Sequence, residues 1–160
     1  MPKITAIEEG AKAPAFTLDS NTGERVSLSA FKGKSAVVYF YPKDDTPGCT
    51  LEAEQFRDLM GDFHKLNAAV LGISPDSAKS HCKFIEKHKL NFALLSDFDH
   101  AVCEKYGAWG EKMLYGRRFF GVLRSTFLID TKGRVAKLWR NVRPNGHAEK
   151  VLCAAREIAP

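Results

Sequence analysis

The feature that most constrains the fold is a continuous apolar run from residue 35 to 41, Ser-Ala-Val-Val-Tyr-Phe-Tyr. A short run of this kind, rich in valine and aromatic residues, predicts a strand that is wholly buried. The segment from residue 51 onward has apolar residues at positions 53, 56, 59, 60 and 63, which is helical spacing. We therefore expect a buried strand, a loop and a helix over about residues 49–66, in that order.

The rest of the chain continues this alternation. We expect strands at 69–74, 91–95, 124–130 and 134–140, helices at 77–89, 99–106 and 147–157, and a hairpin that joins 16–18 to 26–28. Asp76 or Ser77 would cap the helix near 77. This order predicts an α/β sandwich with a central mixed sheet, helices on both of its faces and an N-terminal β-hairpin. The length and the lack of repeats or linkers predict a single domain over residues 1–160.

Charge and hydropathy narrow the classes of function. The net charge is +5, but lysine and arginine are dispersed among 19 acids with no basic run of five, so we expect no nucleic-acid partner. No apolar run approaches membrane-spanning length and the first 13 residues do not resemble a signal peptide, so we expect no membrane partner and a cytoplasmic protein. In the cytoplasm a disulfide is more often catalytic than structural.

Cys49 lies where the predicted buried strand gives way to the predicted helix, directly after a Pro-Gly pair. The first turn of a helix has free N–H groups and a positive dipole end, which stabilise an anion. A cysteine at this place is therefore a candidate thiolate nucleophile. Ligand sites of open α/β sheets also lie at the carboxyl ends of strands, where this loop is expected.

The other three cysteines stand at 82, 103 and 153, and no two cysteines are separated by two residues. The chain therefore has neither a thioredoxin-type C-x-x-C motif nor zinc-ribbon pairs. Cys82 shares a predicted helix with two histidines but with no carboxylate at metal spacing, so we expect no metal site. We expect Cys103 and Cys153 to be buried apolar residues. Trp109, Phe119 and Phe120 are expected in the core or at the rim of the site.

Pro42, Thr46 and Cys49 form the pattern P-x-x-x-T-x-x-C, and Arg124 precedes a later strand. This combination resembles the peroxiredoxins. The wider text resembles the bacterioferritin comigratory protein (Q-type) subgroup, as in Tyr39-Phe40-Tyr41-Pro42-Lys43, Thr46-Pro47-Gly48-Cys49-Thr50, Leu71-Gly72-Ile73-Ser74, Trp109-Gly110-Glu111-Lys112 and Arg124-Ser125-Thr126-Phe127-Leu128-Ile129-Asp130. The resemblance covers nearly the whole chain. It implies a thioredoxin-like fold and a thiol-dependent peroxidase that serves antioxidant defence.

The chemistry of each motif residue fits that activity. A sulfur anion attacks one peroxide oxygen and the other oxygen leaves, so groups that stabilise a thiolate and a departing oxyanion are needed. Arg124 would supply a permanently charged fork of donors. Thr46 can donate to the incoming oxygen and accept from it, and Pro42 can stiffen the loop and shield the sulfur. The sulfur itself changes oxidation state, so we expect no metal, flavin or haem cofactor.

The sequence fits other classes of proteins with a nucleophilic cysteine less well. A tyrosine-phosphatase loop needs arginine six positions after its cysteine, but Gln55 stands there after Cys49 and His88 after Cys82. A cysteine protease needs a paired histidine, and the Cys49 loop contains none. A non-catalytic thioredoxin-fold binding module, or a redox sensor that uses Cys49, is the remaining alternative. Neither would require Thr46, Cys49 and Arg124 together.

The step that restores the oxidised sulfur is left open by the sequence. Many Q-type proteins carry a second cysteine five residues after the first, where this chain has Glu54. Others carry it on the next helix, at a position that corresponds to about Ile85 here, and Cys82 lies one turn before that position. Three routes stay open: Cys82 resolves the sulfenic acid, an external thiol attacks it directly in a one-Cys enzyme, or Cys103 or Cys153 resolves it. The resemblance implies thioredoxin, glutaredoxin or glutathione as reductant, and a monomer or weak dimer.

Overall fold

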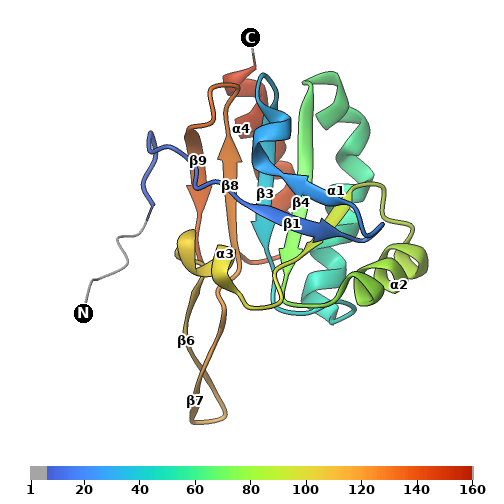
Figure 1. Ribbon diagram of the computed structural model, residues 1–160, viewed down its shortest axis with the longest axis vertical. Coiled ribbons are helices and arrows are strands. Elements are labelled where there is room, and N and C mark those ends of the chain that lie inside the picture. Colours follow the sequence, from blue (N-terminus) through green and yellow to red (C-terminus); the bar gives the residue numbers. More distant parts are fainter. Residues whose placement is uncertain (1–6, 160) are drawn as a thin grey trace.

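A seven-stranded mixed sheet forms the centre of the computed structural model, which describes residues 7–159 (Figure 1). Its strands are β1 (Thr17–Ser20), β2 (Arg25–Ser27), β3 (Ser35–Phe40), β4 (Ala68–Ser74), β5 (Ala93–Ser96), β8 (Ser125–Ile129) and β9 (Val135–Trp139), in the order β2-β1-β5-β4-β3-β8-β9. β3 is parallel to β4 and antiparallel to β8. Every residue of β3 is buried, as its apolar run predicts.

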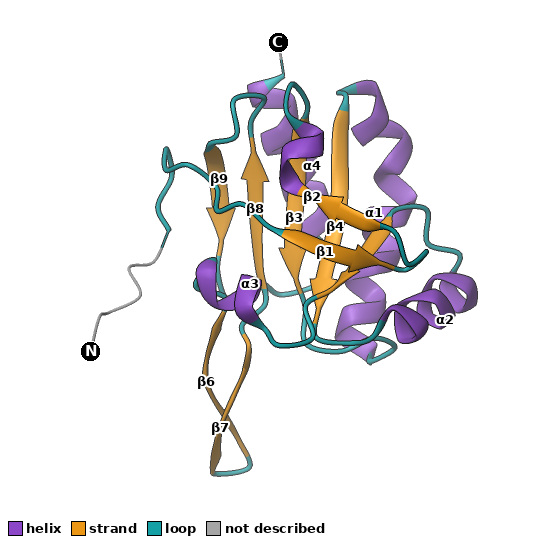
Figure 2. Cartoon of the chain, in the orientation of Figure 1, coloured by secondary structure: helices purple, strands orange, loops and turns teal. Residues whose placement is uncertain are grey.

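Helices cover both faces of this sheet (Figure 2). They are α1 (Pro47–Lys65), α2 (Ala78–His88), α3 (Ala101–Lys105) and α4 (His147–Ile158), and a 3-10 helix, η1 (Leu28–Phe31), precedes β3. Side chains of β3 divide between two cores: Val37 and Tyr39 pack with α1 and α4, whereas Val38 and Phe40 pack with α3 and the N-terminal segment. Polar and apolar residues do not alternate along β3, because both faces of this strand lie in a hydrophobic core.

The predicted central mixed sheet with flanking helices is confirmed, and so is the N-terminal hairpin, in which β1 pairs with β2. β1 also pairs with β5, so the hairpin extends the central sheet rather than standing apart from it. Ser77, not Asp76, caps α2, and its hydroxyl accepts a hydrogen bond from the backbone of Ser80 at 3.1 Å. Most element boundaries differ from the predicted ones by one or two residues.

The predicted strands near 124–130 and 134–140 form a hairpin, in which β8 pairs antiparallel with β9, but a further hairpin between residues 109 and 122 was not predicted. β6 (Trp109–Leu114) and β7 (Arg117–Val122) pair only with each other and project from the body of the molecule (Figure 1). Its turn is Tyr115-Gly116, both with positive φ, and a two-residue turn of this kind matches the twist of antiparallel strands. Phe119 and Phe120 are exposed on this hairpin, so of the two places expected for them, the core and the rim of the site, the core is excluded. Trp109, at its base, is half-buried and stacks on His100 at 3.8 Å.

Cys103 is buried, as predicted, and its thiol donates to the carbonyl of Ala108 at 3.0 Å. Cys153 is exposed, so the expectation that it is buried was wrong. The face of α4 that meets the core contains Ala148, Val151 and Ala155, and Cys153 lies off that stripe. Within residues 7–159, the apolar stretches of the helices are too short to cross a lipid bilayer.

Candidate active site

Cys49 is the third residue of α1 and only 2% of its surface is exposed. Thr46 precedes the helix with extended backbone angles, and Pro47 occupies the first helical position, where its missing N–H costs nothing. The loop from Pro42 to Thr46 therefore connects the carboxyl end of β3 to a helix N-terminus. The predicted position of Cys49 in the first turn of the helix is confirmed.

Arg124 lies between β7 and β8, 75 residues from Cys49 in the sequence, and its guanidinium reaches the sulfur. Nη2 donates to Cys49 Sγ at 3.2 Å. Gly48 makes this approach feasible, because a Cβ at that position would lie 3.3 Å from Arg124 Nη2 and 3.4 Å from Pro144. The fold thus brings together two of the residues that the motif singled out.

Glu52 completes this contact, and the sequence analysis did not identify it. Its side chain is fully buried, and its Oε1 accepts a hydrogen bond from Arg124 Nη1 at 2.7 Å. A signal was present in the sequence. Glu52 lies three residues after Cys49, on the same helix face as Ala53 and Phe56, so it interrupts the apolar stripe that faces the core. A carboxylate in such a stripe needs a partner.

The electrostatics of this group follow from its burial. Burial raises the pKa of Glu52 to about 7, and Arg124 offsets only part of that effect. Burial by itself lowers the pKa of Arg124, but Glu52 and Cys49 outweigh it and raise that pKa, so the guanidinium stays charged. Burial raises the pKa of Tyr39 well above its usual value, and the negative charge of Glu52 adds to this effect. Tyr39 Oη and Glu52 Oε2 have no hydrogen-bond partner within residues 7–159.

Thr46 and Pro42 lie in the loop that precedes α1. The hydroxyl of Thr46 donates to the carbonyl of Lys43 at 2.8 Å, which leaves its oxygen free to accept. To donate to a substrate oxygen, as the sequence predicts, this hydroxyl has to turn away from Lys43. Pro42 is half-buried at the start of the loop.

A buried polar network holds this loop against α2. Asp44 Oδ1 accepts from Tyr41 Oη at 2.6 Å, and its Oδ2 accepts from Ser80 Oγ at 2.7 Å. His81 Nδ1 lies 2.7 Å from Asp44 Oδ2, and its Nε2 donates to the carbonyl of Leu95 at 2.9 Å. His81 is fully buried. Leaving a buried polar group without its hydrogen-bond partner typically costs about 1–3 kcal/mol, so the network anchors the loop.

The fold also places Asp76 beside this pair, and one ligand atom each of Asp44, Asp76 and His81 lie within 4.8 Å of one another. The sequence argument against metal ligands considered only the spacing along one helix, so it missed both aspartates. Their oxygens already accept protein hydrogen bonds: Asp76 Oδ2 accepts from the backbone of Asp44 at 2.7 Å and from Ser74 at 2.8 Å. These contacts explain the cluster as a structural link between the loop and α2.

A second contact joins the loop to α2 at the surface. Asp45, with positive φ, accepts from Lys87 Nζ at 2.7 Å and lies 2.8 Å from His88 Nε2. These hydrogen bonds lower the pKa of Asp45. His81 and His88 are two turns apart and face the loop, whereas Cys82 is exposed to solvent. No disulfide joins Cys82 to Cys49 in this structure.

Comparison with known proteins decides the family. A sequence model described as the AhpC/TSA family matches residues 10–138. Peroxiredoxin Bcp of Bacillus subtilis is 47% identical over 153 residues, which are 96% of this chain and 98% of that protein. The chain belongs to the AhpC/TSA family.

Solved structures place it among the peroxiredoxins of the Bcp and Q type. The bacterioferritin comigratory protein of Xanthomonas campestris has a TM-score of 0.89 and 40% identity, with 96% of this chain and 100% of that chain covered. The PrxQ of Xylella fastidiosa has a TM-score of 0.92 and 36% identity, with 98% and 99% covered. The thioredoxin-like fold and the resemblance are confirmed, and the protein is a thiol-dependent peroxidase.

The raised pKa of Glu52 predicts how this peroxiredoxin's stability depends on pH. The pKa rises from 4.5 to about 7 on folding, so the folded protein binds an extra proton between these values and loses stability as the pH rises through them. Glutamine does not titrate. We therefore expect the free energy of unfolding of Glu52→Gln, taken relative to that of the unsubstituted protein, to rise by up to about 3 kcal/mol between pH 5 and pH 8. Urea unfolding at both pH values measures this difference.

The matched control is Glu86→Gln, which removes an exposed carboxylate from α2. Its effect on the free energy of unfolding should change little over this pH range. A difference between Glu52→Gln and the unsubstituted protein that is the same at pH 5 and pH 8 would contradict the raised pKa.

Proposed function

We propose that Cys49 is the peroxidatic residue and that Arg124 is the group that activates it and stabilises the departing oxygen. The observation that carries this proposal is the 3.2 Å contact between Arg124 Nη2 and Cys49 Sγ at the start of α1. The guanidinium and the helix N-terminus both favour the thiolate. A binding module without catalysis, or a sensor, has no need of a half-buried arginine held by Glu52 against the sulfur.

The reaction is an in-line displacement at oxygen. The Cys49 thiolate attacks one oxygen of the hydroperoxide, the O–O bond breaks, and the other oxygen leaves with the bonding electron pair and takes up a proton. The sulfur loses two electrons and becomes a sulfenic acid, while the peroxide becomes water or an alcohol. Donors that are already in place meet the developing negative charge without reorganisation.

Three further groups assist this step. Thr46 donates its hydroxyl to the peroxide oxygen once it releases the carbonyl of Lys43. Pro42 limits the motion of the loop and the access of water to the sulfur. Glu52 is a positioning residue, because its contact with Nη1 fixes the orientation in which Arg124 presents Nη2 to Cys49.

The substrates in this proposal are hydrogen peroxide and organic hydroperoxides. The related Xanthomonas campestris protein has been studied for its alkyl peroxide reduction activity, with trapped intermediate and ligand complexes. We propose thioredoxin, glutaredoxin or glutathione as the reductant, a cytoplasmic role in antioxidant defence, and one domain over residues 1–160 that acts as a monomer or weak dimer. The chemistry at Cys49 requires no metal, flavin or haem.

We propose that an external thiol reduces the sulfenic acid of Cys49 back to the thiol. Cys49 is buried, so any thiol reaches it only after the first turn of α1 opens. For the exposed Cys82 to reach the Cys49 sulfur, a second movement is needed, because α2 must also separate from the loop. That departure breaks the buried Asp44–His81 contact and the surface contacts of Asp45. The external route needs the smaller rearrangement, and resolution by Cys82 is the second candidate.

We expect Cys49→Ser to abolish peroxide consumption, because a serine hydroxyl cannot be oxidised to a sulfenic acid. The measurement is peroxide removal by protein treated with a metal chelator and supplied with a thiol donor. Cys153→Ser, which changes another free cysteine on the surface, is the control and should retain full activity. Undiminished turnover in Cys49→Ser would refute the assignment.

We expect Arg124→Ala to slow the reaction with peroxide by roughly 100-fold or more, as for the loss of a preorganised donor worth about 2.7–4 kcal/mol. The fraction of Cys49 present as thiolate at neutral pH should fall as well. Arg124→Lys should recover only part of the rate, because a point charge cannot contact Glu52 and Cys49 as the fork does. Stopped-flow measurement of peroxide reduction tests this.

Arg118→Ala is the control for Arg124, since it removes an exposed arginine from the neighbouring hairpin. Its rate should match that of the unsubstituted protein. An equal rate in Arg124→Ala would remove Arg124 from the catalytic site.

The external-thiol route predicts a stable sulfenic acid. After one equivalent of peroxide, a dimedone adduct should form on Cys49, and Cys82→Ser should turn over with the external thiol at an unchanged rate. Peptide mapping by mass spectrometry checks both statements. A Cys49–Cys82 disulfide in the unsubstituted protein would instead establish Cys82 as the resolving residue.

A further inference from the structure

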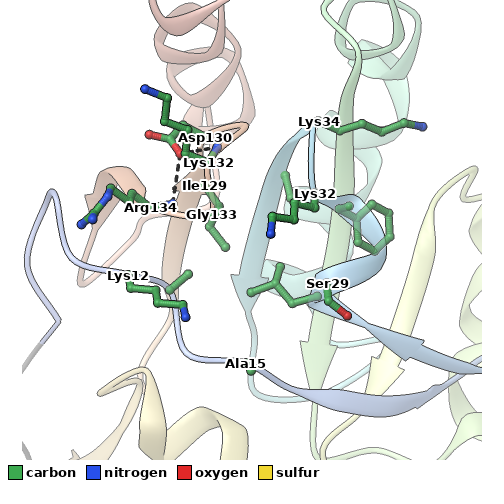
Figure 3. Close-up of a pocket in the computed structure, with 14 residues that line it drawn as sticks. Lys12, Ala15, Ser29, Lys32, Lys34, Ile129, Asp130, Lys132, Gly133 and Arg134 are labelled. Atoms are coloured by element: carbon green, nitrogen blue, oxygen red, sulfur yellow. Dashed lines mark hydrogen bonds between the residues drawn. The ribbon is translucent and has the colours of Figure 1, made fainter.

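A cavity of about 480 Å³ lies at the other end of β3 from Cys49. It is enclosed by residues 12–15, by η1 with the start of β3, and by the turn after β8 (Figure 3). Ala36 near the start of β3 lines it and pairs with Ile129 of β8, whereas the loop to Cys49 leaves the opposite end of the strand. Cys49, Glu52 and Arg124 do not belong to its lining, so the cavity is separate from the peroxidase site.

The floor of this cavity is apolar because small side chains stand where larger ones would fill the space. Its apolar lining consists of Ala13, Ala15, Leu28, Phe31, Ala36 and Ile129. The volume falls in the range of small-molecule sites, which are typically about 300–1,000 Å³ and largely apolar.

The rim carries most of the protein's excess positive charge. It contains Lys12, Lys32, Lys34, Lys132 and Arg134 with one acid, Asp130, which amounts to four of the five net charges of the chain. The carboxylate of Asp130 accepts from the backbone N–H groups of Lys132 at 2.9 Å and Arg134 at 3.0 Å, so it serves the turn. Across residues 7–159, no carboxylate lies within 4 Å of the ammonium group of any of these four lysines.

Two of these lysines are directed at the opening. Figure 3 shows Lys12 and Lys32 extending from opposite walls toward the space between them, whereas Lys34 and Arg134 point away. Like charges that converge without a counter-ion repel each other, and an anion placed between them relieves that repulsion. An ammonium group also binds phosphate readily as a point charge.

We propose that this cavity binds a small phosphorylated ligand with a flat apolar body, of the nucleoside diphosphate class. A flat body fits the alanine floor beside Phe31, and two linked phosphates can meet Lys12 and Lys32 on both walls at once. A single carboxylate could satisfy only one of the two walls. The site lies away from Cys49, so ligand binding leaves the chemical step unchanged.

The probe for this site is ADP, titrated into the reduced protein by isothermal calorimetry. We expect one binding site per chain, weakened roughly tenfold or more in the double variant Lys12→Gln/Lys32→Gln. Ala15→Leu, which occupies the cavity without changing any charge, should weaken binding to a similar extent. Both variants should reduce peroxide at the unsubstituted rate, which also shows that they fold.

Lys65→Gln/Lys83→Gln removes the same charge from α1 and α2 and is the matched control, so it should bind ADP normally. Inorganic pyrophosphate and adenosine, tested separately, should each bind more weakly than ADP. The proposal is overturned if ADP does not bind, if the control loses as much affinity as the cavity variants, or if pyrophosphate binds as tightly as ADP.

Discussion

A single guanidinium, that of Arg124, links the groups to which we assign the chemistry of this protein in our proposal. It donates to the sulfur of Cys49 and to the carboxyl group of Glu52, so one cation is shared between two groups that can each carry a negative charge. This sharing matters for the stability of the folded protein, because a buried charge without a partner is energetically unfavourable. The strand-to-helix loop, α1 and the segment between β7 and β8 must all be correctly placed for the contact to exist.

Glu52 lowers the stability of the folded protein at high pH, and in the proposed mechanism it positions Arg124. Its pKa of about 7 shows that Arg124 does not fully compensate for the loss of solvent around the carboxyl group. In return, the carboxyl group holds the fork of Arg124 in one orientation, with its second nitrogen aimed at the sulfur. A site that keeps its donors fixed in this way loses little free energy to reorganisation when the O–O bond breaks.

The loop before Cys49 is as firmly held as the arginine. Asp44 is tied to His81 inside the protein, and Asp45 is tied to Lys87 and His88 at the surface. Both contacts come from the helix that carries Cys82. Under the proposed mechanism, these contacts fix the loop for peroxide attack, whereas resolution by Cys82 would require α2 to release the loop.

The sequence by itself determined most of the elements and the motif from Pro42 to Cys49, because both depend on local spacing. The apolar run of β3 and the helical periodicity of α1 predict the junction at Cys49, and the motif with Arg124 identifies the chemistry. Only the tertiary structure decided which residues from distant segments meet. It placed Glu52 beside Arg124, and it placed Asp44 and Asp76 beside His81. It also left Phe119, Phe120 and Cys153 exposed. The physical reason is that burial and contact arise when elements pack, and a side chain's spacing along its own helix or strand does not specify what packs against it.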